Sequence, residues 1–302
     1  MIFLLALVLV RASTGDEAGS TSCSTTAGGN TSPLAREAFA RYNRTLRPLV
    51  PAAQVEAYAV DGFTTLRGLL PADLVTAAYE EVEEVWKHYL LPASFQGTAF
   101  LRHARDKLGA AQDTGAGQLP FDRLYNLEQL SPALRRLVTL APMADAVARV
   151  MNVSAVRLYM SSYFRKAAGD SASQWHKDED AAPFVTSHPL QFATLWLPLA
   201  SVRAKDGALM FAKGSHKDNC TYFACELPCE TVSDCYETQT IGDLEPGDAT
   251  LHTGRTFHFS HPNTNAAGRV RPAIAIGFVA TGLKLRTQEG LQSEMLQVRI
   301  YI

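Results

Sequence analysis

The chain from Asn152 onward has the sequence pattern of a β-sandwich or β-barrel. Short apolar runs alternate there with turns rich in Gly, Pro and Asp, at 156–164, 192–199, 207–212, 248–252, 256–260 and 272–280. Regularly spaced short strands of this kind are typical of all-β folds. Two of the runs, QFATLWLPL (191–199) and PAIAIGFVA (272–280), are apolar on both alternation phases. We therefore expect these two strands to be covered on both faces.

The first half of the chain supplies helices for this cover. After Pro71, apolar residues share one helical face and the glutamates lie largely outside it. Ser131 followed by Pro132 predicts a helix start, with serine as the cap and proline at the first helical position. Pro142 is predicted to begin a further helix. Residues 58–70 are predicted to form a short strand followed by a connecting segment, and residues 92–120 a loop. The pattern therefore predicts a mainly β fold with N-terminal helices packed outside a barrel.

The size and charge of the chain narrow its class. Its 302 residues are 47% hydrophobic with a formal net charge of −2, which allows one large domain or two small ones. A nucleic-acid-binding surface would normally be strongly basic, so we expect no nucleic-acid partner. No run in the body of the chain approaches the roughly eighteen apolar residues of a membrane span. We expect no span in the mature chain, and a monomer or weak oligomer.

The N-terminus has the features of a secretory signal. Residues 2–10 are an unbroken apolar run that fits a signal-peptide core, although a basic segment before it is missing and a short buried segment is the alternative. The Ser-, Thr- and Gly-rich stretch that follows cannot offset its ordering entropy by burial. We predict a signal peptide over 1–12, a flexible leader over 13–50, one folded domain over 51–285 and a C-terminal tail over 286–302.

Clustered cysteines also favour an oxidising compartment. Four of them lie within sixteen residues, at Cys220, Cys225, Cys229 and Cys235. Local disulfides are the favoured interpretation, because a zinc knuckle normally uses C-x-x-C spacing, which is missing here. We interpret 217–240 as an insertion between two strands. Four N-glycosylation sequons add mild support for a secretory or extracellular location: Asn30, Asn43, Asn152 and Asn219.

A candidate metal site is formed by His176, Asp178 and the distant His258. Residues two apart in a strand project from the same face, so His176 and Asp178 should share one. A buried histidine hydrogen-bonded to a nearby aspartate is the ordinary explanation of H-x-D alone. His258, in a predicted strand about eighty residues later, completes two histidines and one carboxylate, a set that leaves open positions on Fe(II).

Two cations and three further histidines surround this set in the sequence. Arg271 lies at the edge of the next apolar strand, where its planar fork would suit a carboxylate, and Lys166 could supply a second cation. Of the histidines, His252 is expected to support the site or lie at its rim. His261 precedes a turn and should lie outside it, and His216 should have a structural role.

Several segments between 55 and 280 together resemble the phytanoyl-CoA dioxygenase family of iron(II)/2-oxoglutarate oxygenases. They are YAVDGFTTLRGLLPADLV, LSPALRRLVTLAPMADAVARVMN, SSYFRKAAGDSASQWHKDED, FATLWLPLASVRAKDGALMFAKGSH and GDATLHTGRTFHFSHPNTNAAGRVRPAIAIGF. The combination is specific, although each piece alone is not. The resemblance implies a double-stranded β-helix, the cupin-like jelly roll, and makes 51–285 the oxygenase domain.

The resemblance also implies roles for individual residues. His176, Asp178 and His258 would be the iron ligands. Arg271 would pair with the distal carboxylate of 2-oxoglutarate, and Ser260 would donate a hydrogen bond to the same group. Lys166 matches a lysine position of the family whose role varies. The turn after His258 is longer than is usual in the family, which leaves a choice between Arg269 and Arg271. We prefer Arg271 because it directly precedes the strand.

The implied activity is that of a dioxygenase that uses Fe(II), 2-oxoglutarate and O₂ to hydroxylate a small organic substrate, releasing succinate and CO₂. The carboxylate Asp178 favours hydroxylation over halogenation, since related halogenases lack it. The alternatives are desaturation, epimerisation or ring closure on the same fold, or a secreted binding module without catalysis. The C-terminal sequence, 299–302, is no peroxisomal S-K-L signal, so a peroxisomal acyl-CoA substrate is not supported.

Overall fold

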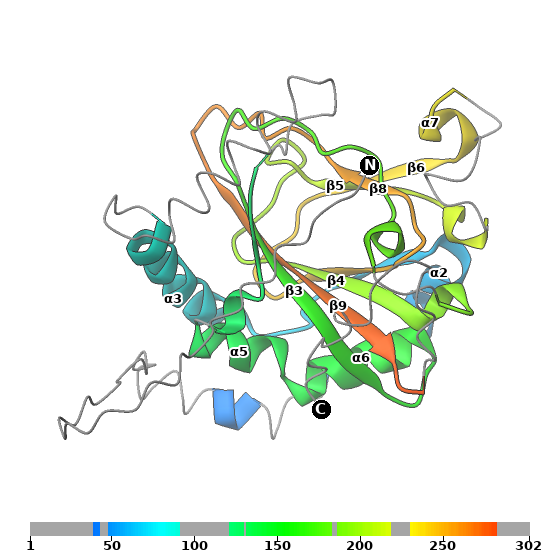
Figure 1. The fold of residues 1–302 in the computed structure, drawn as a ribbon, viewed down its shortest axis with the longest axis horizontal. Coiled ribbons are helices and arrows are strands. Elements are labelled where there is room, and N and C mark those ends of the chain that lie inside the picture. Colours follow the sequence, from blue (N-terminus) through cyan, green and yellow to red (C-terminus); the bar gives the residue numbers. More distant parts are fainter. Residues whose placement is uncertain are drawn as a thin grey trace, which may run out of the picture. The chain divides into compact units, whose positions relative to one another are not determined.

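The chain folds into two antiparallel sheets that pack face to face (Figure 1). A computed structural model describes residues 39–42, 48–90, 121–129, 131–182, 186–218 and 230–282. The large sheet has the order β1 (Phe63–Leu66), β7 (Ala249–Thr253), β4 (Phe192–Pro198), β9 (Arg271–Ala280), β3 (Val156–Lys166) and β2 (Asp122–Tyr125). The small sheet has the order β6 (Thr238–Ile241), β5 (Leu209–Ala212) and β8 (His258–Ser260).

This architecture confirms the predicted mainly β jelly roll. Each of the six predicted apolar runs overlaps one of the strands β3, β4, β5, β7, β8 or β9. All of β4 is buried, and β9 is buried at every position except Ala275. Both strands lie in the middle of the large sheet, where each face has a covering layer, as their continuous apolar character predicted.

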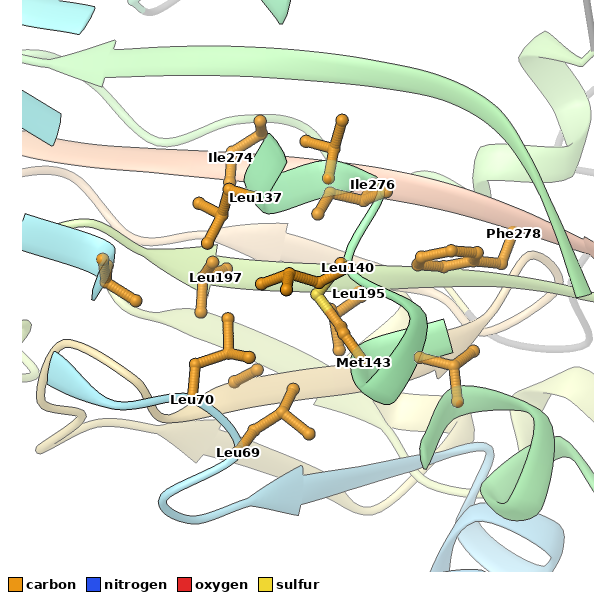
Figure 2. Packing of buried hydrophobic residues seen from close by; sticks show 14 of the residues in the cluster. Leu69, Leu70, Leu137, Leu140, Met143, Leu195, Leu197, Ile274, Ile276 and Phe278 are labelled. Atoms are coloured by element: carbon orange, nitrogen blue, oxygen red, sulfur yellow. The ribbon is translucent and has the colours of Figure 1, made fainter. Parts of the chain in front are cut away.

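The first covering layer is helical. It consists of α2 (Ala52–Asp61), α3 (Ala72–Leu90), α5 (Pro132–Val138) and α6 (Ala141–Met151). Figure 2 shows Leu137, Leu140 and Met143 packed against Leu195 of β4 and Ile276 of β9. The predicted start of α5 is confirmed, because the Ser131 side chain accepts a hydrogen bond from the Leu134 amide at 3.1 Å.

The second covering layer is the small sheet. Side chains alternate along β4, so Trp196 points away from the helices and joins Phe63, Leu209 and Phe211 between the sheets. Phe63 and Phe211 stack with ring centroids 4.5 Å apart. The space between the two sheets therefore has an apolar lining. The polar residues described below project into this space.

Other short elements lie in the connections. They are η1 (Leu127–Gln129), η2 (Asp178–Ala181), η3 (Pro189–Gln191), η4 (Ser215–Lys217) and α7 (Val232–Cys235). Across the described ranges, no helix combines the length and the apolar character needed to cross a membrane.

The prediction of a strand at the start of 58–70 is wrong. Helix α2 continues to Asp61, and β1 begins only at Phe63. Gly62 adopts φ 86° and ψ 0°, and its amide donates to the Tyr58 carbonyl, so it ends the helix in a left-handed conformation that glycine adopts without strain. The sequence Asp61-Gly62 is thus a helix C-cap.

Two short strands, β2 and β6, were not predicted from the sequence pattern. β2 pairs with β3 at the sheet edge, and β6 pairs with β5. β6 begins within 217–240, so the last residues of that segment belong to the small sheet. Several predictions fall outside the described residues and stay predictions: the signal peptide, most of the leader, the loop 92–120, the tail 286–302 and the cysteines Cys220, Cys225 and Cys229.

Candidate metal centre

His176, Asp178 and His258 meet between the two sheets. His258 is the first residue of β8, and His176 lies opposite it in an isolated antiparallel bridge. The two backbones exchange N–H···O=C hydrogen bonds, each 3.0 Å long. One ligand atom from each of the three side chains lies within 4.8 Å of the others, so the cluster could hold a metal ion.

Asp178 reaches the cluster by a different local structure from the one predicted. Lys177 is extended, with φ −114° and ψ 133°, but Asp178 is already the first residue of the 3₁₀ helix η2. The extended residue between them still turns both side chains to one side. His176 Nε2 and Asp178 Oδ1 are 3.7 Å apart.

Backbone carbonyls fix the tautomer of both histidines. Nδ1 of His176 donates to the Gln174 carbonyl at 2.9 Å, and Nδ1 of His258 donates to the Thr256 carbonyl at 3.1 Å. A carbonyl can only accept, so Nδ1 carries the proton and Nε2 keeps its lone pair. Each Nε2 lies 3.7 Å from Asp178 Oδ1. Metal-binding histidines are oriented in this way.

The second carboxylate oxygen of Asp178 is held by two donors from the large sheet. The Thr194 hydroxyl donates to Oδ2 at 2.5 Å, and His252 Nε2 donates to the same atom at 3.1 Å. His252 was expected to support the site or lie at its rim, and its side chain is only 1% exposed. Thr194 was missed, although it is a polar residue in the apolar run 191–199.

The protonation states of the cluster fit a metal ion. Desolvation, and next the neighbouring His258, lower the pKa of His176 to about 4, although 47% of its side chain is exposed. Burial, and next His252, lower the pKa of His258 to about 4. Burial alone would raise the pKa of Asp178, but His258 and the hydrogen bond from His252 outweigh it and hold that pKa well below its usual range. At neutral pH the cluster is two neutral imidazoles and one carboxylate, the forms that bind metals.

His261, His216 and His188 have structural contacts. His261 Nε2 lies 3.0 Å from the Thr240 hydroxyl, outside the cluster as predicted. His216 Nε2 donates to the Ala59 carbonyl at 3.2 Å, which agrees with its expected structural role. The His188 side chain accepts from the Leu190 amide and so caps η3.

Two buried cations lie side by side at the far end of β3 and β9. Lys166 and Arg271 are opposite each other in the strand register, with exposed fractions of 0% and 2%. Lys166 Nζ donates to the Ser260 hydroxyl at 2.9 Å and also to the His261 carbonyl. The three residues that the sequence proposed for 2-oxoglutarate are therefore neighbours.

Arg271 has aromatic neighbours, and no carboxylate of the described ranges lies within ion-pair distance of its guanidinium. Its guanidinium carbon lies 5.3 Å from the ring centroid of Trp196 and 5.6 Å from that of Phe121. Its Nε is buried without a hydrogen-bond partner. Burial lowers the pKa of Arg271 to about 10. An unpaired buried cation is costly, so this arrangement suits an anionic ligand.

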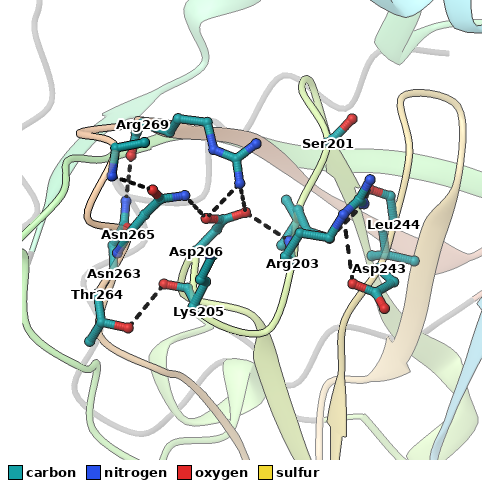
Figure 3. A network of polar contacts seen from close by, with 12 residues as sticks. Ser201, Arg203, Lys205, Asp206, Asp243, Leu244, Asn263, Thr264, Asn265 and Arg269 are labelled. Carbon is teal, nitrogen blue, oxygen red and sulfur yellow. Dashed lines mark hydrogen bonds and ion pairs between the residues drawn. The ribbon is translucent and has the colours of Figure 1, made fainter.

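The structure separates the two arginine candidates. Arg269 turns to Asp206, 3.3 Å away, within a polar network that also contains Asn263 and Asn265 (Figure 3). About half of the Arg269 side chain is exposed. Its charge is already paired, whereas that of Arg271 is not, which agrees with the preference for Arg271.

Known structures share this fold. The non-haem α-ketoglutarate-dependent carbocyclase SnoK from nogalamycin biosynthesis aligns with a TM-score of 0.60 at 20% identity, over 78% of this chain and 87% of its own. EctD from S. alaskensis, with 2-oxoglutarate and 5-hydroxyectoine, aligns with a TM-score of 0.60 at 19% identity, over 80% of each chain. The α-ketoglutarate-dependent epimerase SnoN aligns with a TM-score of 0.58 at 19% identity, over 84% of this chain and 96% of its own.

The family assignment rests on sequence. No curated protein sequence matches this chain. A family model described as phytanoyl-CoA dioxygenase (PhyH) matches residues 58–271, which is most of the chain and includes His176, Asp178, His258 and Arg271. The resemblance of the individual segments is thereby confirmed, and the chain belongs to the phytanoyl-CoA dioxygenase family of iron(II)- and 2-oxoglutarate-dependent oxygenases.

Proposed function

We propose that this protein is an iron(II)- and 2-oxoglutarate-dependent dioxygenase that hydroxylates a small organic substrate. The proposal rests on one observation. The cluster of His176, Asp178 and His258, which could hold a metal ion, lies in the same barrel as Arg271, a buried cation without an ion-paired carboxylate among the described residues. In the balanced reaction, the substrate, 2-oxoglutarate and O₂ give the hydroxylated product, succinate and CO₂. One oxygen atom enters the product and the other enters succinate.

In this proposal His176 Nε2, His258 Nε2 and Asp178 Oδ1 would hold the iron. Three protein ligands leave positions open for the co-substrates. When bound, iron and 2-oxoglutarate would supply the oxidative chemistry with O₂, while the protein supplies position and shelter. The Nδ1 hydrogen bonds of the two histidines keep their Nε2 lone pairs available, so no proton must leave at neutral pH before the metal binds.

The distal carboxylate of 2-oxoglutarate is assigned to Arg271, Ser260 and Lys166. The guanidinium fork can donate two parallel hydrogen bonds to one carboxylate. The Ser260 hydroxyl and Lys166 Nζ are already hydrogen-bonded to each other. A carboxylate between them would neutralise the charge that the fold leaves unpaired, which makes the site selective for a dicarboxylic oxo acid.

Other oxidative outcomes use the same residues. Among the solved structures with this fold are a carbocyclase and an epimerase, which supports ring closure or epimerisation as the second candidate reaction. Asp178 supports hydroxylation over halogenation, because the carboxylate occupies the position that a halide would need. The substrate class in either case is a small organic molecule.

Anaerobic calorimetry with the full chain tests the site assignment. We expect 2-oxoglutarate to bind much more tightly in the presence of Mn(II), used in place of Fe(II), than in its absence. Glutarate keeps both carboxylates but lacks the keto group that chelates the metal, so its weak binding should not depend on Mn(II). Equal affinity of 2-oxoglutarate with and without the metal would contradict the proposal.

The pKa of Lys166 predicts that 2-oxoglutarate binding weakens as the pH rises. Burial, and next the charge of Arg271, lower this pKa to about 7, against a smaller opposing effect of Asp170. A bound carboxylate raises it again, so above the free-state pKa binding must take up a proton. The dissociation constant should then rise by up to about tenfold for each pH unit between the free and bound pKa values.

Anaerobic titrations between about pH 6 and about pH 9 measure this dependence. The iron-binding histidines do not contribute there, because their pKa values of about 4 lie below the range. In Lys166→Met the affinity should be lower at the acid end and the slope should disappear. An unchanged slope in that variant would show that another group takes up the proton.

A further inference from the structure

Asp178 has one oxygen directed at the histidines and one held by the large sheet. We propose that Thr194 and His252 are positioning residues that fix Asp178 as a one-oxygen metal ligand. Oδ1 lies 3.7 Å from Nε2 of both His176 and His258, whereas Oδ2 accepts from Thr194 and His252. This inference rests on the proposed metal site and adds the two residues that orient its only charged ligand.

The two contacts are strong enough to determine the orientation. Hydrogen bonds to a carboxylate are shorter and roughly twice as strong as those between neutral groups. The Thr194 contact, at 2.5 Å, has the length of a charge-assisted O–H···O bond. Both donors are almost fully buried, so water does not compete for them. With two donors on Oδ2, rotation of the carboxylate would break both hydrogen bonds.

Strand register places the two donors together. Thr194 of β4 and His252 of β7 are directly opposite each other, so their side chains leave the same face of the sheet. Asp178 itself begins the short helix η2, which lies outside both sheets. The large sheet therefore orients the Asp178 carboxylate, which the short helix η2 alone would leave free to rotate.

His252 is committed to this contact. The carboxylate can only accept, so His252 Nε2 carries a proton and donates it. The Nδ1 atom of His252 is buried and has no partner within the described ranges. Its ring lies against Phe211 and His258, with centroid distances of 5.1 Å and 4.3 Å. An apolar side chain could pack against these rings equally well. The hydrogen bond to Asp178 is therefore the contact that requires an imidazole at this position.

The consequence for the metal site is a defined number of open positions. A carboxylate that is free to rotate can offer both oxygens to a metal and so occupy two positions. Asp178, held at Oδ2, offers Oδ1 alone. Removing either donor should weaken metal binding and change the ligand field, because the carboxylate then samples other orientations.

The test measures Mn(II) affinity without 2-oxoglutarate, in Thr194→Val and His252→Phe. Loss of a residue that orients a metal ligand typically costs about 10- to 100-fold in metal affinity, and we expect a loss in that range for each variant. Thr194→Ser keeps the hydroxyl and His252→Gln keeps an N–H donor, so both should recover most of the affinity. In the Co(II)-substituted protein, the visible absorption should change in the Val and Phe variants and stay close to wild type in the Ser and Gln variants.

Thr250→Val is the matched control. Thr250 is a buried threonine on β7, next to Trp196 in the register, and its hydroxyl has no partner in the described part of the chain. Its replacement should leave Mn(II) affinity and the Co(II) spectrum unchanged. Thermal unfolding of every variant separates loss of the site from loss of the fold.

Two results would overturn the inference. One is wild-type Mn(II) affinity with an unchanged Co(II) spectrum in both Thr194→Val and His252→Phe. The other is an equal loss in Thr194→Val and Thr194→Ser, which would make packing the cause. Failure of the wild-type protein to bind Mn(II) is distinguishable from both, because it would remove the metal site of the proposed function together with this inference.

Discussion

Replacing Asp178 with alanine is expected to abolish the conversion of 2-oxoglutarate to succinate. The variant loses the only negatively charged residue of the cluster and leaves the donors Thr194 and His252 without their acceptor. Residues that merely orient a metal ligand cost about 10- to 100-fold when lost, so loss of the ligand itself should exceed about 100-fold. Succinate formation with added Fe(II) and O₂ measures the effect.

Asp180→Ala is the control for this prediction. Asp180 lies on the same 3₁₀ helix, two residues beyond Asp178, but outside the cluster of possible ligands. Its replacement should leave succinate formation near the wild-type rate. If Asp178→Ala turned over 2-oxoglutarate as fast as Asp180→Ala, the assignment of the carboxylate ligand would be wrong.

Arg271→Met is expected to separate the affinity for 2-oxoglutarate from the stability of the fold. A hydrogen bond to a charged group contributes about 1.5–3 kcal/mol, so losing the bidentate pair should raise the KM for 2-oxoglutarate by about 100-fold or more. Without ligand, the variant should be as stable as the wild type or more stable. The variant places an apolar side chain of similar length where the wild type has a buried cation without an ion-paired carboxylate among the described residues.

Two further variants sharpen this prediction. Arg269→Met removes the neighbouring arginine, which pairs with Asp206, and should leave the KM for 2-oxoglutarate unchanged. Arg271→Lys keeps the charge but loses the planar fork, so it should recover only part of the affinity. Enzyme kinetics and thermal unfolding are needed together. A raised KM in Arg269→Met with a normal KM in Arg271→Met would reverse the choice between the two arginines.

The sequence was sufficient for the parts of the site that depend on local pattern. His176 and Asp178 are two residues apart, and one extended residue between them is enough to bring them together. Arg271 begins the long apolar strand β9, and His258 begins β8, which lies within the predicted run 256–260. Periodicity and family segments could therefore locate all four residues, even though the strand predicted at Asp178 is a 3₁₀ helix in the structure.

The contacts made by Thr194 and His252 could not be predicted in the same way. They depend on the register between β4 and β7, strands separated by fifty residues, and on the path of η2 beside them. The short strands β2 and β6 were missed for a related reason. Their sequences, DRLY and TQTI, are not apolar runs, and these strands exist because β3 and β5 supply hydrogen-bonding partners. At Gly62, a helix cap and a turn have the same sequence signature.

The most direct test of the central claim is the release of succinate from 2-oxoglutarate by the purified wild-type protein. The assay contains Fe(II), O₂ and each member of a panel of small organic molecules in turn. The predicted result is succinate and CO₂ in equal amounts, dependent on Fe(II) and O₂ and increased by a molecule that is itself oxidised. Binding of 2-oxoglutarate with no succinate under any condition would contradict the account and identify a binding module on an oxygenase fold.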